Sequence, residues 1–221
     1  MTALKGPERH AASGTARALV VLVHGYGADG DDLMGLAGPI APHLPMAAFR
    51  APNGPERSLV NPMGYQWFPI PFMDGSSEAE MIAGFRKAQT ALATYLAAEM
   101  KSLKVSPEAT VLVGFSQGTM MSLAVGPGVE PALAGIVGFS GRLAEPEVLK
   151  TAPSRPPVLL VHGDQDPVVP VEEMTKAEKG LTAAGFDVQT HVSEGVGHGI
   201  APDGLGLLLG FLKDRLPSAR G

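Results

Sequence analysis

The chain has 221 residues, 45% of them hydrophobic, and this length and composition suit one globular domain with a sizeable core. Its formal net charge is −5 and its 17 lysine and arginine residues are scattered, which excludes the basic stripe that nucleic-acid binding requires. The chain contains no cysteine, so disulfides and thiolate metal sites are excluded as well.

Residues 1–16 show no strand or helix pattern, and we expect a flexible N-terminal tail in front of a single domain over residues 17–221. The tail lacks the apolar core of a secretory signal, so the cytoplasm is the expected location. The longest apolar stretch near the C-terminus, residues 205–212, is far shorter than the roughly 20 residues that a membrane span needs. We therefore expect no membrane span.

The first expected strand, residues 18–23, leads into a glycine-rich loop, His24 to Gly30, with the sequence H-G-Y-G-A-D-G. A loop between an early strand and a helix can present a backbone N–H to a developing oxyanion, and Tyr26 is the candidate donor. His24 is interpreted as a structural histidine bonded to backbone. The aspartates of this region lack the spacing of a calcium loop and suit the first turn of a helix, so no metal site is expected.

A second strand is expected over residues 46–50, and the proline-rich segment 63–73 that follows it is interpreted as a loop. Its apolar and aromatic side chains indicate either a packed connection or the wall or lid of an acyl pocket. On the second interpretation, the candidate substrate-binding residues are Trp67, Phe68, Phe72 and Met73.

The longest expected helix begins at residues 77–80, where S-E-A-E forms a capping-box pattern. Apolar residues then recur near one face, which predicts a helix that packs on the core: Met81, Phe85, Leu92, Leu96 and Met100. This helix follows the aromatic segment and precedes the next expected strand, residues 109–114.

That strand runs into Gly114 to Gly118, G-F-S-Q-G, which is the pattern of a nucleophile elbow. In an elbow the serine lies on a strained turn between a strand and a helix, so Ser116 is the candidate nucleophile. A second helix is expected to begin at Gln117, whose backbone N–H is the other candidate oxyanion donor.

A near match to the elbow lies at Gly138 to Arg142, G-F-S-G-R, after the expected strand 133–139. It lacks the closing glycine, so Ser140 is interpreted as a strand-end residue near the site. Downstream residues distinguish the two serines, because a serine nucleophile needs a base within reach and that base needs an orienting carboxylate.

The next two expected strands, 157–162 and 186–192, are each followed by a turn that carries a titratable residue. The first precedes an acidic turn in which Asp166 is the candidate orienting acid and Asp164 is its rival. The second leads into a glycine loop that contains His198, the candidate base. Asp166 lies 50 residues after the candidate serine and 32 before the histidine, which leaves room for the intervening elements.

Strand-like segments alternate with helical patterns along the chain, which predicts an α/β fold. We expect a mostly parallel central sheet with helices on both faces in a single domain. The chain order serine, acid, histidine is that of the α/β-hydrolase fold.

The chain contains four motifs in this order: H-G-x-G-A-D-G, G-F-S-Q-G, H-G-D-x-D-x-V-V-P and G-H-G. With these motifs, nearly the whole chain resembles the carboxylesterase/phospholipase family of α/β-hydrolases, which includes the acyl-protein thioesterases. The resemblance implies a serine esterase or thioesterase whose triad is Ser116, Asp166 and His198, which favours Asp166 over its rival. It also implies oxyanion donors at Tyr26 and Gln117.

The chain departs from the family pattern at two places. Family members often have an aromatic pair followed by aspartate before the long helix, where this chain has Trp67-Phe68-Pro69. They often have a leucine where Tyr26 stands. Both departures concern the substrate pocket rather than the reaction.

The expected activity is that of a serine carboxylesterase, which hydrolyses small acyl or aryl esters through an acyl-enzyme without a cofactor. The alternatives within the hydrolases are a lysophospholipase and an acyl-protein thioesterase. An acyltransferase and a non-catalytic ligand-binding scaffold are alternatives from other classes. The expected partner is a small ester substrate, and exposed apolar loops leave a homodimer open.

Overall fold

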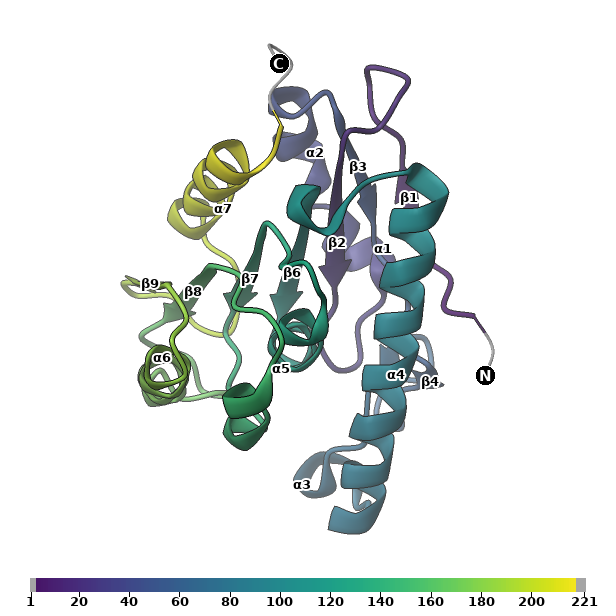
Figure 1. Cartoon of the computed structure of the whole chain (residues 1–221). Coiled ribbons are helices and arrows are strands. Elements are labelled where there is room, and N and C mark those ends of the chain that lie inside the picture. The colour runs from purple at the N-terminus through teal and green to yellow at the C-terminus, as the bar shows by residue number, and fades with distance from the viewer. Residues whose placement is uncertain (1–2, 218–221) are drawn as a thin grey trace.

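The computed structural model describes residues 3–217, which are organised around a seven-stranded sheet (Figure 1). In spatial order its strands are β1 (Glu8–Arg9), β3 (Ala47–Arg50), β2 (Ala18–Val23), β6 (Thr110–Phe115), β7 (Gly135–Phe139), β8 (Val158–Gly163) and β9 (Val188–Ser193). The short β1 pairs antiparallel with β3, and the other described strands of this sheet pair in parallel. The predicted fold, a mostly parallel sheet in a single α/β domain, is confirmed.

The six expected strands all form, and their ends differ from the expected ones by no more than two residues. The strands β2 and β8 are buried along their whole length, which explains why they are near-continuous apolar runs in the sequence. At the edge of the sheet, β9 is mostly exposed or half-buried, and its sequence is correspondingly more polar.

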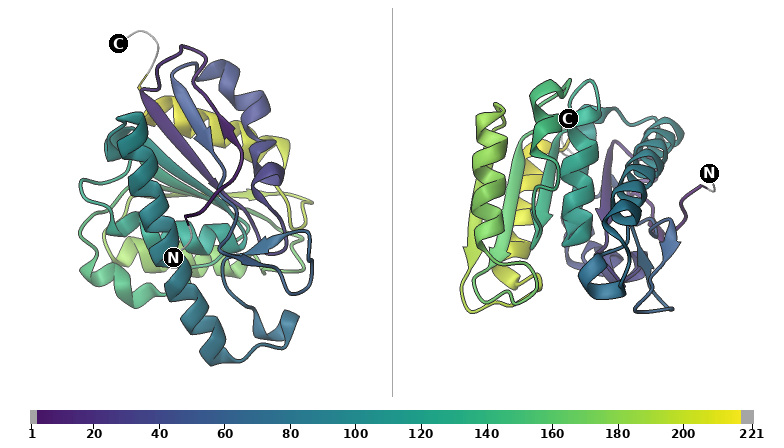
Figure 2. Two further views of the ribbon diagram at one scale, coloured as in Figure 1. Left: turned by 90° about the vertical axis from the view of Figure 1, so that its right-hand side faces the viewer. Right: turned by 90° about the horizontal axis from the view of Figure 1, so that it is seen from below.

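Helices cover both faces of the sheet, as the two views of Figure 2 show. One face packs against α1 (Gly30–Met34), α2 (Ala37–Ile40) and α7 (Pro202–Arg215), and the other against α4 (Glu78–Leu103), α5 (Gln117–Val125) and α6 (Glu172–Ala183). Successive side chains of β2 point to opposite faces and therefore join different apolar clusters. The short 3-10 helices are Ala41–His43, Pro107–Ala109, Gly126–Gly128 and Pro146–Thr151.

The long helix α4 begins where the capping box predicts. The Ser77 hydroxyl accepts from Glu80 N at 3.2 Å and the Glu80 carboxylate accepts from Ser77 N at 2.8 Å, so both arms of the box are present. Of the predicted apolar residues, Phe85, Leu92 and Leu96 are buried in the core, and Met81 and Met100 are partly buried and pack against it. None of the described helices is long and apolar enough to cross a membrane.

The expected flexible tail, residues 1–16, needs correction. Its first two residues lie outside the described part of the chain, but β1 is hydrogen-bonded into the sheet. Three further backbone bonds attach the segment, from Asn53 N to Lys5 O (2.8 Å), from Ala51 N to Pro7 O (3.1 Å) and from Ser13 N to Pro45 O (3.0 Å). A two-residue strand is too short to produce a periodic pattern, which is why the sequence does not predict it.

The segment 63–73, expected as a loop, contains short regular elements. Within it, β5 (Tyr65–Gln66) pairs antiparallel with β4 (Glu56–Arg57), which precedes the segment, and the single helical turn α3 (Pro71–Asp74) begins near its end. In Figure 1, α3 lies beside the lower end of α4, beyond the carboxyl ends of the central strands. This placement brings the aromatic segment to the end of the sheet where α/β proteins bind ligands.

Candidate active site

Ser116 lies on the tight turn between β6 and α5, with φ +52° and ψ −113°. A non-glycine residue in such a conformation costs about 1–3 kcal/mol, which the surrounding structure must offset. Hydrogen bonds hold both sides of the turn, from Ser116 N to Phe139 O (2.8 Å) and from Thr119 N to Ser116 O (3.0 Å). The serine is therefore presented in a fixed orientation at the carboxyl end of the central strand.

The glycines of the elbow are required by close packing of backbones. A Cβ atom on Gly118 would overlap the carbonyl of Val23 in β2, and one on Gly114 would overlap the backbone of Gly118. The turn can approach β2 this closely only without side chains at these positions. The two glycines of the G-x-S-x-G pattern are therefore required by the close approach of backbones.

Ser140 also has a positive φ, +45°, and follows β7 directly. Its side chain is fully buried, and within residues 3–217 its hydroxyl has no hydrogen-bond partner. It is not among the residues that line the large cavity beside Ser116. The structure therefore places the two serines in different environments.

His198 and Asp166 form a pair, with 2.8 Å between His198 Nδ1 and Asp166 Oδ2. The aspartate side chain is 0% exposed, and its Oδ1 accepts from the amides of Val168 and Val169, both at 2.9 Å. Burial acts to raise the pKa of Asp166, but the hydrogen bonds from Val169, His198 and Val168 outweigh it and lower the pKa below its ordinary value. Both oxygens of the Asp166 carboxylate therefore have hydrogen-bond partners.

The rival acid, Asp164, points elsewhere. It is exposed, and its Oδ1 accepts from Gly195 N at 2.6 Å, which bridges two neighbouring turns. His162 is buried, with its Nε2 2.8 Å from Val169 O and 3.4 Å from Asp166 Oδ2. Of the two acids in this turn, the structure brings Asp166 to His198.

The candidate oxyanion donors come from two places in the fold, the start of α5 for Gln117 and the loop after β2 for Tyr26. Gln117 is the first residue of α5, so its backbone N–H has no acceptor within the helix. In residues 3–217 no backbone or side-chain acceptor is bonded to the amide of Tyr26 or of Gln117. Tyr26, Gln117, Ser116 and His198 line the same cavity.

His24, next to Tyr26, has the expected structural role. Gly54 N donates to its Nε2 at 2.9 Å, so Nδ1 carries the proton and donates to Gly25 O at 2.7 Å. Burial lowers the pKa of His24 below its ordinary value, which favours this neutral form. The histidine fixes the backbone of the loop that contains Tyr26.

The side chain of Gln117 has a role that the sequence does not reveal. Its Oε1 accepts from Trp67 N at 2.8 Å and its Nε2 donates to Phe68 O at 2.7 Å. The amide group thus binds an extended backbone segment 50 residues away, as a neighbouring strand would. It attaches the aromatic segment directly to the elbow.

We expect Gln117→Ala to destabilise the protein by about 2–4 kcal/mol, because it leaves a buried N–H and a buried C=O without partners. Urea unfolding followed by circular dichroism measures this change. Gln165→Ala is the matched control, since Gln165 is exposed and its side chain bonds only to its neighbour Asp164 in the described structure. Equal stability of the two variants would contradict the bridging role of Gln117.

The cavity beside Ser116 has a volume of about 720 Å³, which is enough for a substantial acyl or aryl group. Its apolar lining includes Phe68, Ile70, Phe72, Met73, Met81 and Met120. Three of the four candidate substrate-binding residues, Phe68, Phe72 and Met73, are therefore at its wall.

Trp67 requires a correction. Its side chain is 0% exposed and does not line the cavity; it belongs to the apolar cluster beneath α4. The indole Nε1 donates to His24 O at 3.0 Å, and the two rings lie 5.5 Å apart. A buried tryptophan satisfies its N–H in this way, so Trp67 supports the loop of Tyr26 instead of contacting substrate.

Within residues 3–217, no group of three or more histidine, aspartate or glutamate side chains is arranged to hold a metal ion. Besides Tyr26 and His198, the ionisable residues at the cavity wall are Glu78, Arg142 and Glu173.

Comparison with known proteins agrees with this description. The Phospholipase/Carboxylesterase family matches residues 6–216. Esterase YpfH of Escherichia coli is 34% identical over 205 residues, which cover 91% of this chain and 84% of that protein. Acyl-protein thioesterase 1 of Gibberella zeae is 30% identical over 218 residues, covering 90% of this chain and 91% of that protein. The crystal structure of esterase PE8 has a TM-score of 0.92 and 42% identity, and covers 97% of this chain and 100% of that chain.

A mostly parallel sheet with a serine on the sharp turn after a central strand is the architecture of an α/β-hydrolase. The chain belongs to the phospholipase/carboxylesterase family and is an ester-hydrolysing serine hydrolase. The resemblance seen in the sequence motifs is confirmed.

Proposed function

We propose that the protein is a carboxylesterase for small acyl or aryl esters, with Ser116 as nucleophile, His198 as base and Asp166 as the residue that orients the base. The observation that carries this proposal is the 2.8 Å bond between His198 Nδ1 and Asp166 Oδ2, at a cavity that Ser116 also lines. A carboxylate only accepts hydrogen bonds, so Nδ1 carries the proton and Nε2 keeps its lone pair. That tautomer is the one able to accept a proton from a serine.

In the proposed mechanism, His198 Nε2 takes the proton of Ser116 as Oγ attacks the ester carbonyl. The amides of Tyr26 and Gln117 donate to the oxyanion that develops. Collapse of the intermediate transfers the proton to the leaving alcohol and leaves an acyl group on Ser116. His198 then activates water, which attacks the acyl-enzyme and releases the acid. None of these steps requires a cofactor.

A covalent label tests the assignment of the nucleophile. A fluorophosphonate ester reacts with an activated serine and adds a stable phosphonyl group, whose mass identifies the modified peptide. Because no Lys or Arg lies between residues 105 and 141, fragmentation of the labelled peptide is needed to locate the group, and we expect it on Ser116. A label on Ser140, or no labelling under conditions that preserve the fold, would contradict the proposal.

Thioester hydrolysis is the second candidate, because several relatives are named acyl-protein thioesterase 1. Both reactions pass through the same acyl-enzyme, so the acyl group alone does not distinguish them. Paired substrates that share one acyl group, an aryl ester and an alkyl thioester, measure the preference through their ratio of kcat/KM. A lysophospholipid with the same acyl group tests the remaining alternative.

The apolar wall of the cavity predicts a preference for acyl groups longer than acetyl. We expect Phe72→Ala to lower the ratio of kcat/KM for p-nitrophenyl octanoate to that for acetate by about fivefold, since it removes apolar contact with the longer chain. Leu207→Ala is a matched control, because Leu207 is an exposed apolar residue of α7 that does not line the cavity. A ratio unchanged by Phe72→Ala would exclude this residue from the acyl site.

A further inference from the structure

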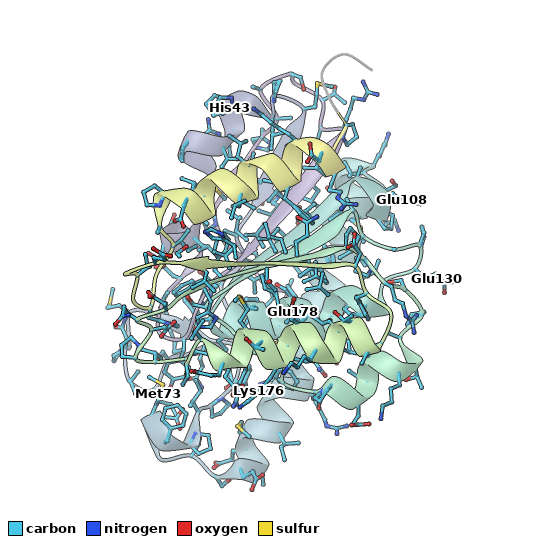
Figure 3. All side chains as sticks on the ribbon, turned by 90° about the vertical axis from the view of Figure 1, so that its left-hand side faces the viewer. His43, Met73, Glu108, Glu130, Lys176 and Glu178 are labelled. Carbon is cyan, nitrogen blue, oxygen red and sulfur yellow. The ribbon has the colours of Figure 1, made fainter. Side chains whose placement is uncertain are left out.

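The helical turn α3 forms one wall of the cavity, and few contacts of its own residues hold it in place. None of the four residues of α3 is buried, and the residues Phe72 and Met73 are 83% and 42% exposed. Figure 3 labels Met73 near the lower end of the molecule. A single exposed helical turn is not stable by itself, because it forms few bonds and buries little apolar area. Something else must fix it relative to Ser116.

Asp74, the last residue of α3, provides the anchor. Its Oδ2 accepts from Ile70 N at 2.7 Å and its Oδ1 from Ser76 N at 2.9 Å, and both of these bonds stay within the segment. Its Oδ2 also accepts from the Tyr26 hydroxyl at 2.8 Å. Within residues 3–217, this is the only hydrogen bond that joins residues 70–76 to a part of the chain distant in sequence.

Tyr26, the donor of this hydrogen bond, lies on a loop that is itself held in place. Its loop is bonded to β5 and to the turn before it, from Gly27 N to Tyr65 O (2.8 Å) and from Asn61 Nδ2 to Gly27 O (2.8 Å). The side chain of Tyr26 is half-buried and lines the cavity. The hydroxyl is thus presented from a fixed loop to a segment that has few other attachments.

We propose that the Tyr26 hydroxyl and the Asp74 carboxylate form a clamp that fixes α3 as the wall of the acyl cavity, so that Tyr26 is a positioning residue that determines acyl-chain preference. The side chain at position 26 then acts separately from its backbone N–H. Residues of α3 contact the distal part of a long acyl chain, whereas a short chain stays near Ser116. Loosening the wall therefore weakens binding of long chains more than of short ones.

The clamp keeps one protonation state over the working pH range. Burial acts to raise the pKa of Asp74, but hydrogen bonds from Ser76, Ile70 and Tyr26 outweigh it and lower the pKa to about 2. Burial and the bond to Asp74 raise the pKa of Tyr26 to about 12. Between these values a neutral O–H donates to a carboxylate, which is a charge-assisted bond. The chain-length preference should accordingly stay constant between about pH 5 and 9.

The first test measures the clamp without reference to activity. Hydrogen–deuterium exchange of the full-length protein reports the opening of residues 70–76, whose amides at Met73, Asp74 and Gly75 are bonded within the turn. We expect Tyr26→Phe to accelerate exchange of this segment about fivefold or more, with no change in the strands of the sheet. Unchanged exchange in Tyr26→Phe would overturn the clamp, whatever reaction the enzyme catalyses.

The second test is kinetic and rests on the proposed esterase function. We expect Tyr26→Phe and Asp74→Ala each to lower the octanoate-to-acetate ratio of kcat/KM about fivefold, mainly through a higher KM for octanoate. The double variant should show no more than Asp74→Ala alone, because that change already removes the bond that Tyr26→Phe removes, together with the two bonds within the segment. Tyr65→Phe, a half-buried tyrosine of β5 outside the cavity lining, should leave the ratio unchanged.

The outcomes separate the two proposals. Additive effects of the two single changes, or an unchanged ratio in Tyr26→Phe, would overturn the role in chain preference. A uniform loss of kcat on both esters would indicate general damage to the oxyanion loop and would also overturn it. If esterase activity survives Ser116→Ala, the proposed function fails, while accelerated exchange in Tyr26→Phe still establishes the clamp.

Discussion

Ser116→Ala should lower kcat/KM on p-nitrophenyl butyrate by about 10⁴-fold or more and leave the protein folded. In the proposed mechanism, the change removes the oxygen that forms the acyl-enzyme, and the amides of Tyr26 and Gln117 supply only the small remaining acceleration. Initial rates measured at high enzyme concentration give the residual activity. Circular dichroism and urea unfolding establish that the fold is retained.

The matched control is Ser140→Ala. This serine shares the positive φ and the position after a central strand, but its hydroxyl is buried away from the cavity and has no partner in the described structure. Removing an unpartnered hydroxyl should change kcat/KM less than about threefold. If Ser140→Ala lost as much activity as Ser116→Ala, the elbow at Ser116 would not be the site of chemistry.

The sequence predicts those features that depend on local pattern. The buried runs of β2, β6 and β8 are almost purely apolar, so their positions are visible without a structure. The two glycines of the elbow mark a close approach of backbones that no larger residue allows. The capping box of α4 also acts within four residues.

The features that the sequence misses depend on partners far apart in the chain. Gln117 binds backbone 50 residues away and Tyr26 binds a carboxylate 48 residues away, and no periodic pattern reports either pair. The prediction that Trp67 binds substrate is wrong for the same reason. The sequence alone does not distinguish an aromatic loop residue that faces a cavity from one that faces the core. The residues of the acidic turn alone do not distinguish Asp166 from Asp164; the family resemblance favours Asp166, and the structure brings it to His198.

That choice leads to the second large effect. Asp166→Asn should lower kcat at pH 7 by about 10³- to 10⁴-fold, whereas Asp164→Asn should change it less than about threefold. Asp164 is exposed and accepts one backbone bond through Oδ1, which an asparagine oxygen can also accept. The two substitutions are chemically identical and two residues apart, so the pair controls for local disruption of the turn.

The expected loss in Asp166→Asn follows from the tautomer of His198. The amides of Val168 and Val169 donate to the atom at the Oδ1 position, so the asparagine oxygen, which accepts hydrogen bonds, takes that position. The asparagine NH₂ group then faces His198 Nδ1. Nδ1 must then accept, the proton moves to Nε2, and the ring can no longer take a proton from Ser116.

Stability gives an independent measure of the same carboxylate. Because folding lowers the pKa of Asp166, its charge stabilises the protein above its unfolded pKa of about 3.9, and this contribution is lost as the pH falls through the folded value. The difference in unfolding free energy between wild type and Asp166→Asn should therefore be largest near pH 7 and shrink below about pH 4. A difference that stays constant down to pH 3, together with full activity of the variant, would mean that the aspartate neither holds His198 nor carries a charge that folding favours.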